Sequence, residues 1–168
     1  FLLSGTGSVH LDDAFAFQKG MNHICARHEA AAVYMAEAAS KLTGTIGVVI
    51  ATTGPGGTNA ISGIVEAWVD STAVLVISGQ VNSHEISEGV RSFGVQGFNI
   101  IENVENLTKY AIQVTDPESI RFHLEKAIHE ALSGRQGPVW LDIPFDVQAS
   151  MINPEDLRGY VPEVCSDE

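Results

Sequence analysis

Five short runs of apolar and β-branched residues recur along the chain, and longer stretches of helical pattern separate them. The runs do not alternate strictly between apolar and polar residues, which is typical of parallel strands that are buried on both faces. They cover residues 1–3, 46–50, 73–77, 111–114 and 138–143, with a short sixth run at 21–25. This order predicts an α/β domain: a doubly wound, mostly parallel sheet of about six strands with helices on both faces.

Three helices are predicted between these strands. Residues 27–42 are Ala-rich and precede Gly44, and residues 56–69 follow a Gly-Pro-Gly turn. Residues 117–132 follow Asp116, which is suited to cap the helix, and end before Gly134. We expect a long loop with at most a short helix at 79–101, which are rich in Gly, Ser and Asn, and a linker or tail at 150–168.

Composition narrows the classes of function. The 168 residues include 9 Lys or Arg and 21 Asp or Glu, a net charge of −12, and 45% of them are hydrophobic. A chain of this size can bury a core without disulfides, and its charge repels nucleic acid and anionic membrane surfaces. Cys25 and Cys165 have no pairing pattern, and no segment has the pattern of a membrane span or a signal peptide. We expect a cytoplasmic protein that binds neither nucleic acid nor membrane.

Glycine-rich turns follow three of the predicted strands, at residues 4–8, 52–59 and 78–80. In an open parallel sheet the carboxyl ends of the strands form the ligand crevice, where helix N-termini offer unpaired N–H groups. The first turn lacks the third glycine and the downstream acid of a dinucleotide site, and the second lacks the lysine of a phosphate-binding loop. The turns therefore predict a crevice that is not a site for nucleoside triphosphates.

Glu29 is the candidate catalytic residue. It falls in the first turn of the Ala-rich helix, just after the short run at 21–25, so its carboxylate is expected at the edge of the crevice. The helix dipole alone also favours an acid there, so a structural role stays open. No metal site is predicted: His28-Glu29 lacks the second histidine of a zinc protease, since residue 32 is Ala, and the other histidines have no ligand spacing. The pattern of a serine nucleophile elbow is absent as well.

Several motifs, in the same order and at similar intervals, resemble the amino-terminal pyrimidine-binding domain of thiamine-diphosphate-dependent enzymes, above all the acetolactate synthase large subunit. They are Arg-His-Glu-Ala-Ala-Ala at 27–32, Lys-Leu-Thr-Gly at 41–44, Thr-Gly-Pro-Gly-Gly-Thr-Asn at 53–59, Ser-Gly-Gln-Val at 78–81, Thr-Lys-Tyr at 108–110 and Gly-Arg-Gln-Gly-Pro-Val-Trp-Leu-Asp-Ile-Pro at 134–144. The resemblance covers residues 1 to about 149 and implies that this domain is truncated at its N-terminus, because the chain opens inside an apolar run.

The resemblance implies roles for particular residues. Glu29 becomes the acid that hydrogen-bonds N1′ of the cofactor's aminopyrimidine and so favours the tautomer that takes the proton from C2 of the thiazolium. The implied reaction is decarboxylation of a 2-keto acid, followed by addition of the carbanion to a second carbonyl, with thiamine diphosphate as the electron sink. Gln96 is implied on the substrate side, and the residues implied beside the pyrimidine, Glu29 included, are Gly5, Thr6, Gly7, Thr53, Gly54, Pro55 and Asn59.

The resemblance also implies what the chain does not carry. In the family, the diphosphate and its Mg²⁺ lie on a separate domain with a Gly-Asp-Gly motif, which this sequence lacks. The active site lies between two subunits, so at least a homodimer is implied, and the isolated chain is expected to be inactive. A requirement for FAD and a place in amino-acid biosynthesis stay open.

One departure from acetolactate synthases concerns the second substrate. Those enzymes have Phe-Gln-Glu where this chain has Val95-Gln96-Gly97, and Asn-Ile-Ile at 99–101 is more like related enzymes with other acceptors. The donor and acceptor therefore stay open. So do two other readings: a non-catalytic binding or assembly module that retains the fold, and a nucleotide-binding α/β protein.

Overall fold

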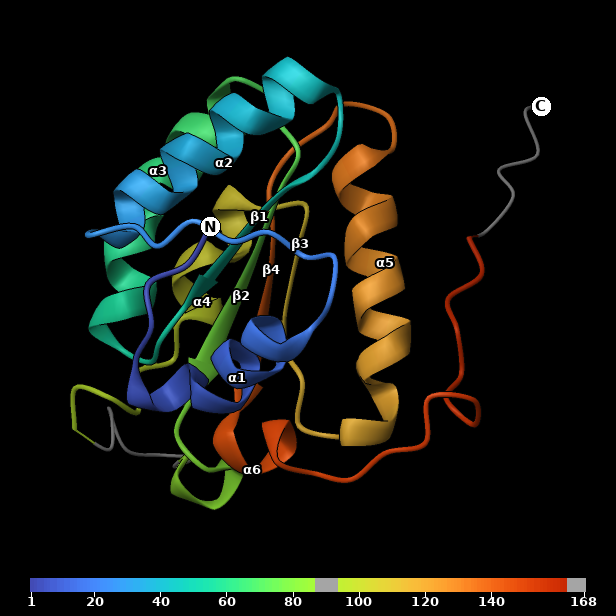
Figure 1. Ribbon diagram of the computed structural model, residues 1–168. Coiled ribbons are helices and arrows are strands. Elements are labelled where there is room, and N and C mark those ends of the chain that lie inside the picture. Colours follow the sequence, from blue (N-terminus) through green and yellow to red (C-terminus); the bar gives the residue numbers. More distant parts are fainter. Residues whose placement is uncertain (87–93, 163–168) are drawn as a thin grey trace.

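The computed structural model describes residues 1–86 and 94–162 (Figure 1). Its centre is one sheet of four parallel strands in the order β1-β2-β4-β3. Parallel strands need crossover connections, and helices supply most of these here. The strands are β1 (Gly47–Ala51), β2 (Val74–Gln80), β3 (Tyr110–Gln113) and β4 (Val139–Pro144).

The described residues form six helices: α1 (Val9–Phe17), α2 (Glu29–Thr43), α3 (Pro55–Val69), α4 (Ile101–Val104), α5 (Ile120–Leu132) and α6 (Phe145–Gln148). The residues that were predicted to start or end helices do so in the structure. Gly44 ends α2 in the left-handed conformation, with φ 69°, and Pro55 lies in the first turn of α3. Asp116 caps a 3₁₀ turn, residues 117–119, that leads into α5, because its side chain accepts a hydrogen bond from the Glu118 backbone N–H at 3.0 Å. The three predicted helices are confirmed within two or three residues. None of the helices in the described ranges is long and apolar enough to cross a bilayer.

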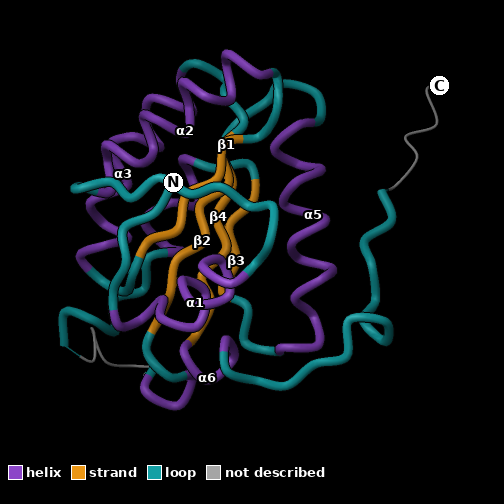
Figure 2. The backbone as a smooth tube through the Cα atoms, in the orientation of Figure 1, coloured by secondary structure: helices purple, strands orange, loops and turns teal. Residues whose placement is uncertain are grey.

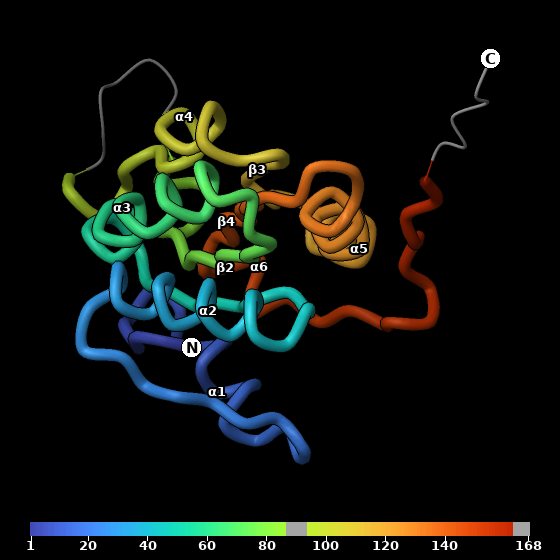
Figure 3. Tube along the Cα trace, turned by 90° about the horizontal axis from the view of Figure 1, so that it is seen from above, coloured from blue at the N-terminus to red at the C-terminus, as the bar shows by residue number. Residues whose placement is uncertain are grey.

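Helices cover both faces of the sheet (Figure 3). Val49, Val76 and Trp140 are neighbours in register, and their face packs against α2, α3 and α4. The opposite face, which includes Leu75 and Val139, packs against α5. Because side chains alternate between the two faces of a strand, apolar runs such as 74–77 fill both cores at once.

The prediction of about six strands is wrong. The two amino-terminal runs each make isolated bridges: Leu2 pairs with Ile50 of β1 on one side and with Cys25 on the other, both in parallel. Figure 2 shows the strands grouped at the centre of the molecule, with the amino-terminal segment as a loop beside them. The 1–3 run enters the 3₁₀ turn at Thr6 almost at once, and residues 18–25 are exposed to solvent, so neither run is long enough and buried enough to form a full strand.

Other segments also differ from expectation. The sequence pattern did not indicate α1 or α6, and the predicted loop at 79–101 holds a 3₁₀ turn, residues 83–85, and the start of α4. Part of that loop, 87–93, lies outside the described residues, as does Cys165. The expected tail lies against α5 up to residue 162: the Tyr160 N–H donates to Glu125 Oε2 at 2.7 Å, and Arg121 donates to the Leu157 carbonyl.

Candidate functional site

The three glycine-rich turns meet at the carboxyl edge of the sheet. The Gly7 N–H donates to Oγ1 of Thr52 at 3.1 Å, which joins the first turn to the second. A β-carbon at Gly7 would overlap the Thr53 side chain, and one at Gly79 would overlap the Gly7 carbonyl. Glycine is required at residue 79 because two backbones approach too closely there for any side chain, and at residue 7 because the Thr53 side chain fills the space.

A pocket of about 510 Å³ opens beside this junction. It brings together four of the predicted site residues, Thr6, Gly7, Thr53 and Gln96, from segments far apart in the sequence. Two further lining residues, Thr52 and Gln80, lie in the glycine-rich turns that were predicted at the crevice. The remaining ones were not predicted and are Val81, Asn82, Glu85 and Phe145. The pocket wall is therefore formed by loops that follow β1, β2 and β4, as expected for an open parallel sheet.

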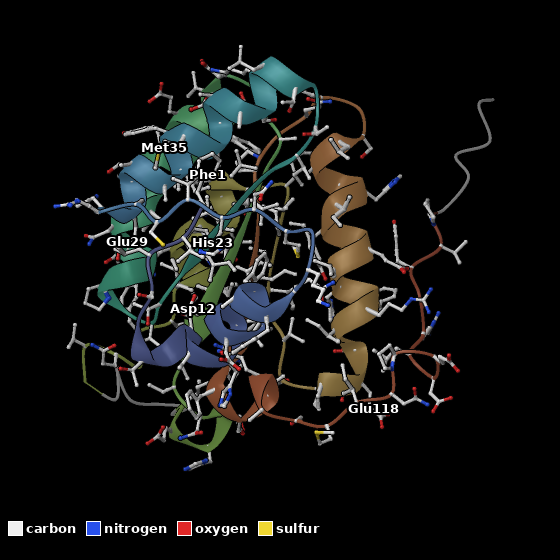
Figure 4. All side chains as sticks on the ribbon, viewed as in Figure 1. Phe1, Asp12, His23, Glu29, Met35 and Glu118 are labelled. Carbon is white, nitrogen blue, oxygen red and sulfur yellow. The ribbon has the colours of Figure 1, made fainter. Side chains whose placement is uncertain are left out.

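Glu29 lies at the first position of α2 and is 6% exposed (Figure 4). Its Oε2 accepts a hydrogen bond from Nδ2 of Asn59, on α3, at 3.0 Å. Among the described residues, no group donates a hydrogen bond to Oε1. The His28 ring caps this end of the helix, since its Nδ1 accepts from the Ala30 N–H at 3.2 Å. One carboxylate oxygen is thus held by the protein, and the other is left to accept a hydrogen bond from a ligand.

The Glu29–Asn59 pair is separate from the pocket wall, and Thr52 and Gly56 lie between them. A β-carbon at Gly56 would lie 2.8 Å from Cγ2 of Thr52 and 3.5 Å from Oε1 of Glu29. Thr52 also lines the pocket. The bare backbone of Gly56 therefore leaves room beside the carboxylate. The predicted residues outside the pocket wall are Gly5, Glu29, Gly54, Pro55 and Asn59.

The turn at Gly54 lies directly against the segment that carries Gln96. Gly54 has φ 54°, and a β-carbon there would overlap the Val95 carbonyl. The Thr53 hydroxyl donates a hydrogen bond to Oε1 of Gln96. These contacts fix Gln96 on the pocket wall, next to the turn that starts α3.

Several other acidic residues in the described ranges are engaged by protein partners. Oε2 of Glu85, on the pocket wall, accepts from both nitrogens of Asn82 in a capping box. Glu37 and Asp70 are both bound by Lys41, at 2.8 and 2.6 Å. With Glu66 they form a group of three acids near the carboxyl ends of α2 and α3, the opposite ends from Glu29 and Asn59.

The pocket residues that were not predicted come just after β2 and β4, two strands that were themselves predicted. Gln80 lies in the turn at 78–80 that was predicted to line the crevice, but it was not singled out as a site residue. Asn82 and Glu85 lie in a loop without a periodic pattern, and Phe145 starts a four-residue helix. The position of these residues depends on the strand order, which puts β4 next to β2.

The family model described as "Thiamine pyrophosphate enzyme, N-terminal TPP binding domain" matches residues 1–100. The chain belongs to this family. Its relatives include the acetolactate synthase isozyme 3 large subunit of Escherichia coli, 39% identical over 96% of this chain, and the acetolactate synthase large subunit of Buchnera aphidicola subsp. Schizaphis graminum, 41% identical over 94%. Acetolactate synthase 2 of Nicotiana tabacum, a chloroplastic protein, is 36% identical over 96%. The resemblance found in the motifs is confirmed.

The chain spans about a quarter of the length of these curated relatives: 27% of the E. coli protein, 28% of the Buchnera protein and 24% of the tobacco protein. The family description assigns a thiamine pyrophosphate binding role to the matched domain.

Proposed function

We propose that the chain is the pyrimidine-binding domain of a thiamine-diphosphate-dependent 2-keto acid decarboxylase and carboligase, similar to acetolactate synthase, and that Glu29 is its catalytic carboxylate. The observation that carries this proposal is the geometry of Glu29: a buried carboxylate with one oxygen held by Asn59 and the other left to accept a hydrogen bond. A carboxylate in such a place is suited to share a proton with a ring nitrogen.

The residues around Glu29 fit a flat aromatic ring. Gly56 has no side chain beside Oε1, and Gly7 brings bare backbone against Thr53. Thr6, Gly7, Thr53, Gly54, Pro55 and Asn59 are the residues that would hold the pyrimidine, with Gly5 packed behind them against Thr52. Thiamine diphosphate supplies the electron sink for decarboxylation when it is bound.

Each side chain of the site has a distinct task in this proposal. Glu29 holds or accepts the proton at the ring nitrogen through Oε1, and Asn59 keeps Oε2 in place. Gln96 and Thr53, joined by their hydrogen bond, face the 510 Å³ pocket where the keto acid and its acceptor would bind. The pocket is lined mainly by uncharged polar side chains, which can orient a carbonyl by hydrogen bonding.

The rest of the reaction requires protein outside this chain. We assign the diphosphate and Mg²⁺ to a separate domain and the completed site to a homodimer or larger assembly, working in the cytoplasm. The isolated chain should then show no turnover. Thiamine-diphosphate-dependent consumption of pyruvate by the 168-residue chain alone would contradict this assignment.

Substitution of Glu29 tests the proposed role. In the natural full-length protein, Glu29→Gln should lower thiamine-diphosphate-dependent turnover of a 2-keto acid by at least about a hundredfold, because the amide cannot share a proton in this way. Glu37→Gln is the matched control: Glu37 is on the same helix and 3% exposed, but it pairs with Lys41. Glu37→Gln should leave the rate within a small factor of the wild-type rate.

The alternative is a non-catalytic binding or assembly module that retains the fold. If this alternative is correct, Glu29→Gln and Glu37→Gln should have equal effects on turnover. A nucleotide-binding role would instead show as a rise in the melting temperature with NAD(H) or ATP, since a ligand of the native state stabilises it.

A further inference from the structure

A buried polar cluster lies beneath the pocket, centred on Asp142 of β4. Asp142 is 0% exposed. Its Oδ1 accepts from the Ser78 hydroxyl at 2.5 Å, and its Oδ2 accepts from Nε2 of Gln80 at 3.0 Å and from Nε2 of Gln113 at 2.9 Å. Trp140 Nε1 donates to the same Ser78 hydroxyl at 2.8 Å. The cluster therefore joins β2, β3 and β4 near their carboxyl ends.

No cation in the part of the chain that the structure describes pairs with this carboxylate. Burial raises the pKa of Asp142 to about 6, and the hydrogen bonds from Ser78, Gln113 and Gln80 oppose the shift without cancelling it. Asp146, on the adjacent α6, is bound by Ser83. Among the described residues, the other titratable groups on the helices packed against the sheet make no hydrogen bond to Asp142; they are Glu29, Tyr34, Glu37 and Lys41 on α2, Glu66 on α3, Glu102 on α4, and Arg121, His123, Glu125, Lys126, His129 and Glu130 on α5.

Gln80 extends this cluster to the pocket wall. Its side chain is buried, its Nε2 also donates to the Phe98 carbonyl at 3.0 Å, and its Oε1 accepts from the Val81 N–H at 2.9 Å. Phe98 is two residues after Gln96, and Gln80 itself lines the pocket. Gln80 thus connects a buried charge to the segment that presents Gln96.

Three partners determine which way the Gln80 amide points, and the charge on Asp142 is one of them. An ionised carboxylate only accepts hydrogen bonds, so the NH₂ group must face it. The reversed amide would put an oxygen against both Oδ2 of Asp142 and the Phe98 carbonyl, and an NH₂ group against the Val81 N–H. Only one orientation satisfies all three partners while Asp142 is ionised.

We propose that Asp142 and Gln80 are positioning residues: the buried carboxylate orients the Gln80 amide, and this amide holds residues 96–98 on the pocket wall. The link to substrate binding rests on the proposed function, whereas the link to the loop does not. Protonated Asp142 is a weaker acceptor, so it adds less to this orientation, and the hydrogen bonds of Gln80 to the Phe98 carbonyl and the Val81 N–H are left to hold the loop alone.

Gln80→Met and Gln113→Met form a matched pair. Each removes one donor to Oδ2 of Asp142, but only Gln80 also contacts Phe98. Hydrogen–deuterium exchange of peptides that cover 94–100 should be about five to ten times faster in Gln80→Met than in wild-type protein, as expected for the loss of one hydrogen bond. Gln113→Met should leave these peptides near the wild-type rate. Equal rates in the two variants would overturn the proposal.

A titration of unmodified protein gives a second test that needs no substitution in the cluster. The Trp140 indole N–H is one hydrogen bond from Ser78 and two from Asp142, so its ¹⁵N-indole resonance should titrate with a midpoint near pH 6. Trp68→Phe assigns the resonance, because the sequence contains only two tryptophans. The amide resonances of 97–99 should move with the same midpoint. An indole that titrates while these amides stay fixed, or no inflection between pH 4.5 and 7.5, would contradict the proposal.

Activity measurements separate this proposal from the proposed function. In the full-length protein, Gln80→Met should raise the KM for the keto acid more than it lowers kcat, and Gln113→Met should change neither strongly. If Gln80→Met frees the loop in an otherwise inactive protein, the positioning role stands and the proposed function fails. If the protein is active and both variants leave the loop unchanged, the positioning role alone fails.

Discussion

Glu29 and Asn59 are 30 residues apart and come from two different helices, yet one hydrogen bond of 3.0 Å joins their side chains. Both residues were predicted in the site, with Asn59 expected beside the pyrimidine. Its contact with Glu29 could not be predicted from sequence, because it depends on how α2 and α3 lie against each other. The packing of Gly63 against Val33 lets these two helices approach closely.

Removal of the Asn59 amide should leave the Glu29 carboxylate in place but without the hydrogen bond that positions it. Asn59→Ala leaves Oε2 of a buried carboxylate without its donor, so turnover of the full-length protein should fall by about tenfold or more, which is less than for Glu29→Gln. Steady-state kinetics with a 2-keto acid measure this loss. Thr58→Ala is the neighbouring control, since the Thr58 hydroxyl is exposed and donates only to the Pro55 carbonyl. Equal losses in both variants would argue against a special role for Asn59.

At the scale of elements, one motif of the family resemblance proves to be structural. Thr108 donates to the Val104 carbonyl at 2.8 Å, and Tyr110 shares a 2.6 Å hydrogen bond with Nδ1 of His123 on α5. Between them, Nζ of Lys109 donates to the backbone carbonyls of Glu130 and Ser133 at the end of α5. A cation at a helix C-terminus satisfies carbonyls that have no partner within the helix. Lys109 and Tyr110 thus anchor α5 to β3, and Thr108 binds the end of α4.

Substitution of Lys109 should weaken this anchor and leave the site intact. Lys109→Met keeps the length of the side chain but loses both hydrogen bonds, so the free energy of unfolding should fall by about 1–2 kcal/mol. Urea denaturation measures the change. The exposed Lys19 serves as the control, and Lys19→Met should stay within about 0.5 kcal/mol of wild type. A Lys109→Met variant as stable as wild type would refute the anchoring role.

Elements with strong local signals were predicted well, and those that depend on tertiary packing were not. Helices α2, α3 and α5 have caps or breakers that act on the backbone next to them, such as Gly44 and Asp116. Helix α1 buries none of its residues, so it has no apolar face that a periodic pattern could reveal. The composition of residues 1–3 predicts a strand, but Leu2 is the one residue of this run that forms β-bridges.

The site residues also fall into two groups: those with a local sequence signal were predicted, and those that depend on tertiary packing were not. Residues in glycine-rich turns after strands were correctly expected at one edge of the sheet, as the contact of Gly7 with Thr53 shows. Phe145 was missed as a pocket residue because its approach to Gln96 follows from the order β1-β2-β4-β3. Strand order is a property of the whole sheet and left no local pattern in this sequence.

At the scale of the whole molecule, the buried charge of Asp142 makes stability depend on pH. The pKa is raised from 3.8 to about 6 in the folded state, so the folded state binds a proton more tightly than the unfolded chain. The contribution of this group to stability is therefore fully present below pH 3.8 and is lost as the pH rises through 6.

Asp142→Asn should remove this dependence, because Asn cannot titrate. The difference in unfolding free energy between Asp142→Asn and wild type should shift in favour of the variant by about 3 kcal/mol between pH 3.5 and pH 7.5. Paired urea denaturation curves at several pH values measure this difference and cancel the contributions of other carboxylates. A difference that is constant with pH would contradict the assignment of a raised pKa to Asp142.

The chain as a whole covers about a quarter of its curated relatives and carries one side of the proposed active site. The central claim is that Glu29 prepares the pyrimidine of thiamine diphosphate for removal of the C2 proton. Hydrogen–deuterium exchange at C2 of thiamine diphosphate bound to the full-length protein measures this step without any substrate. We predict that Glu29→Gln slows the exchange by about a hundredfold or more while Glu37→Gln does not. Exchange at the wild-type rate in cofactor-loaded Glu29→Gln protein would contradict the account.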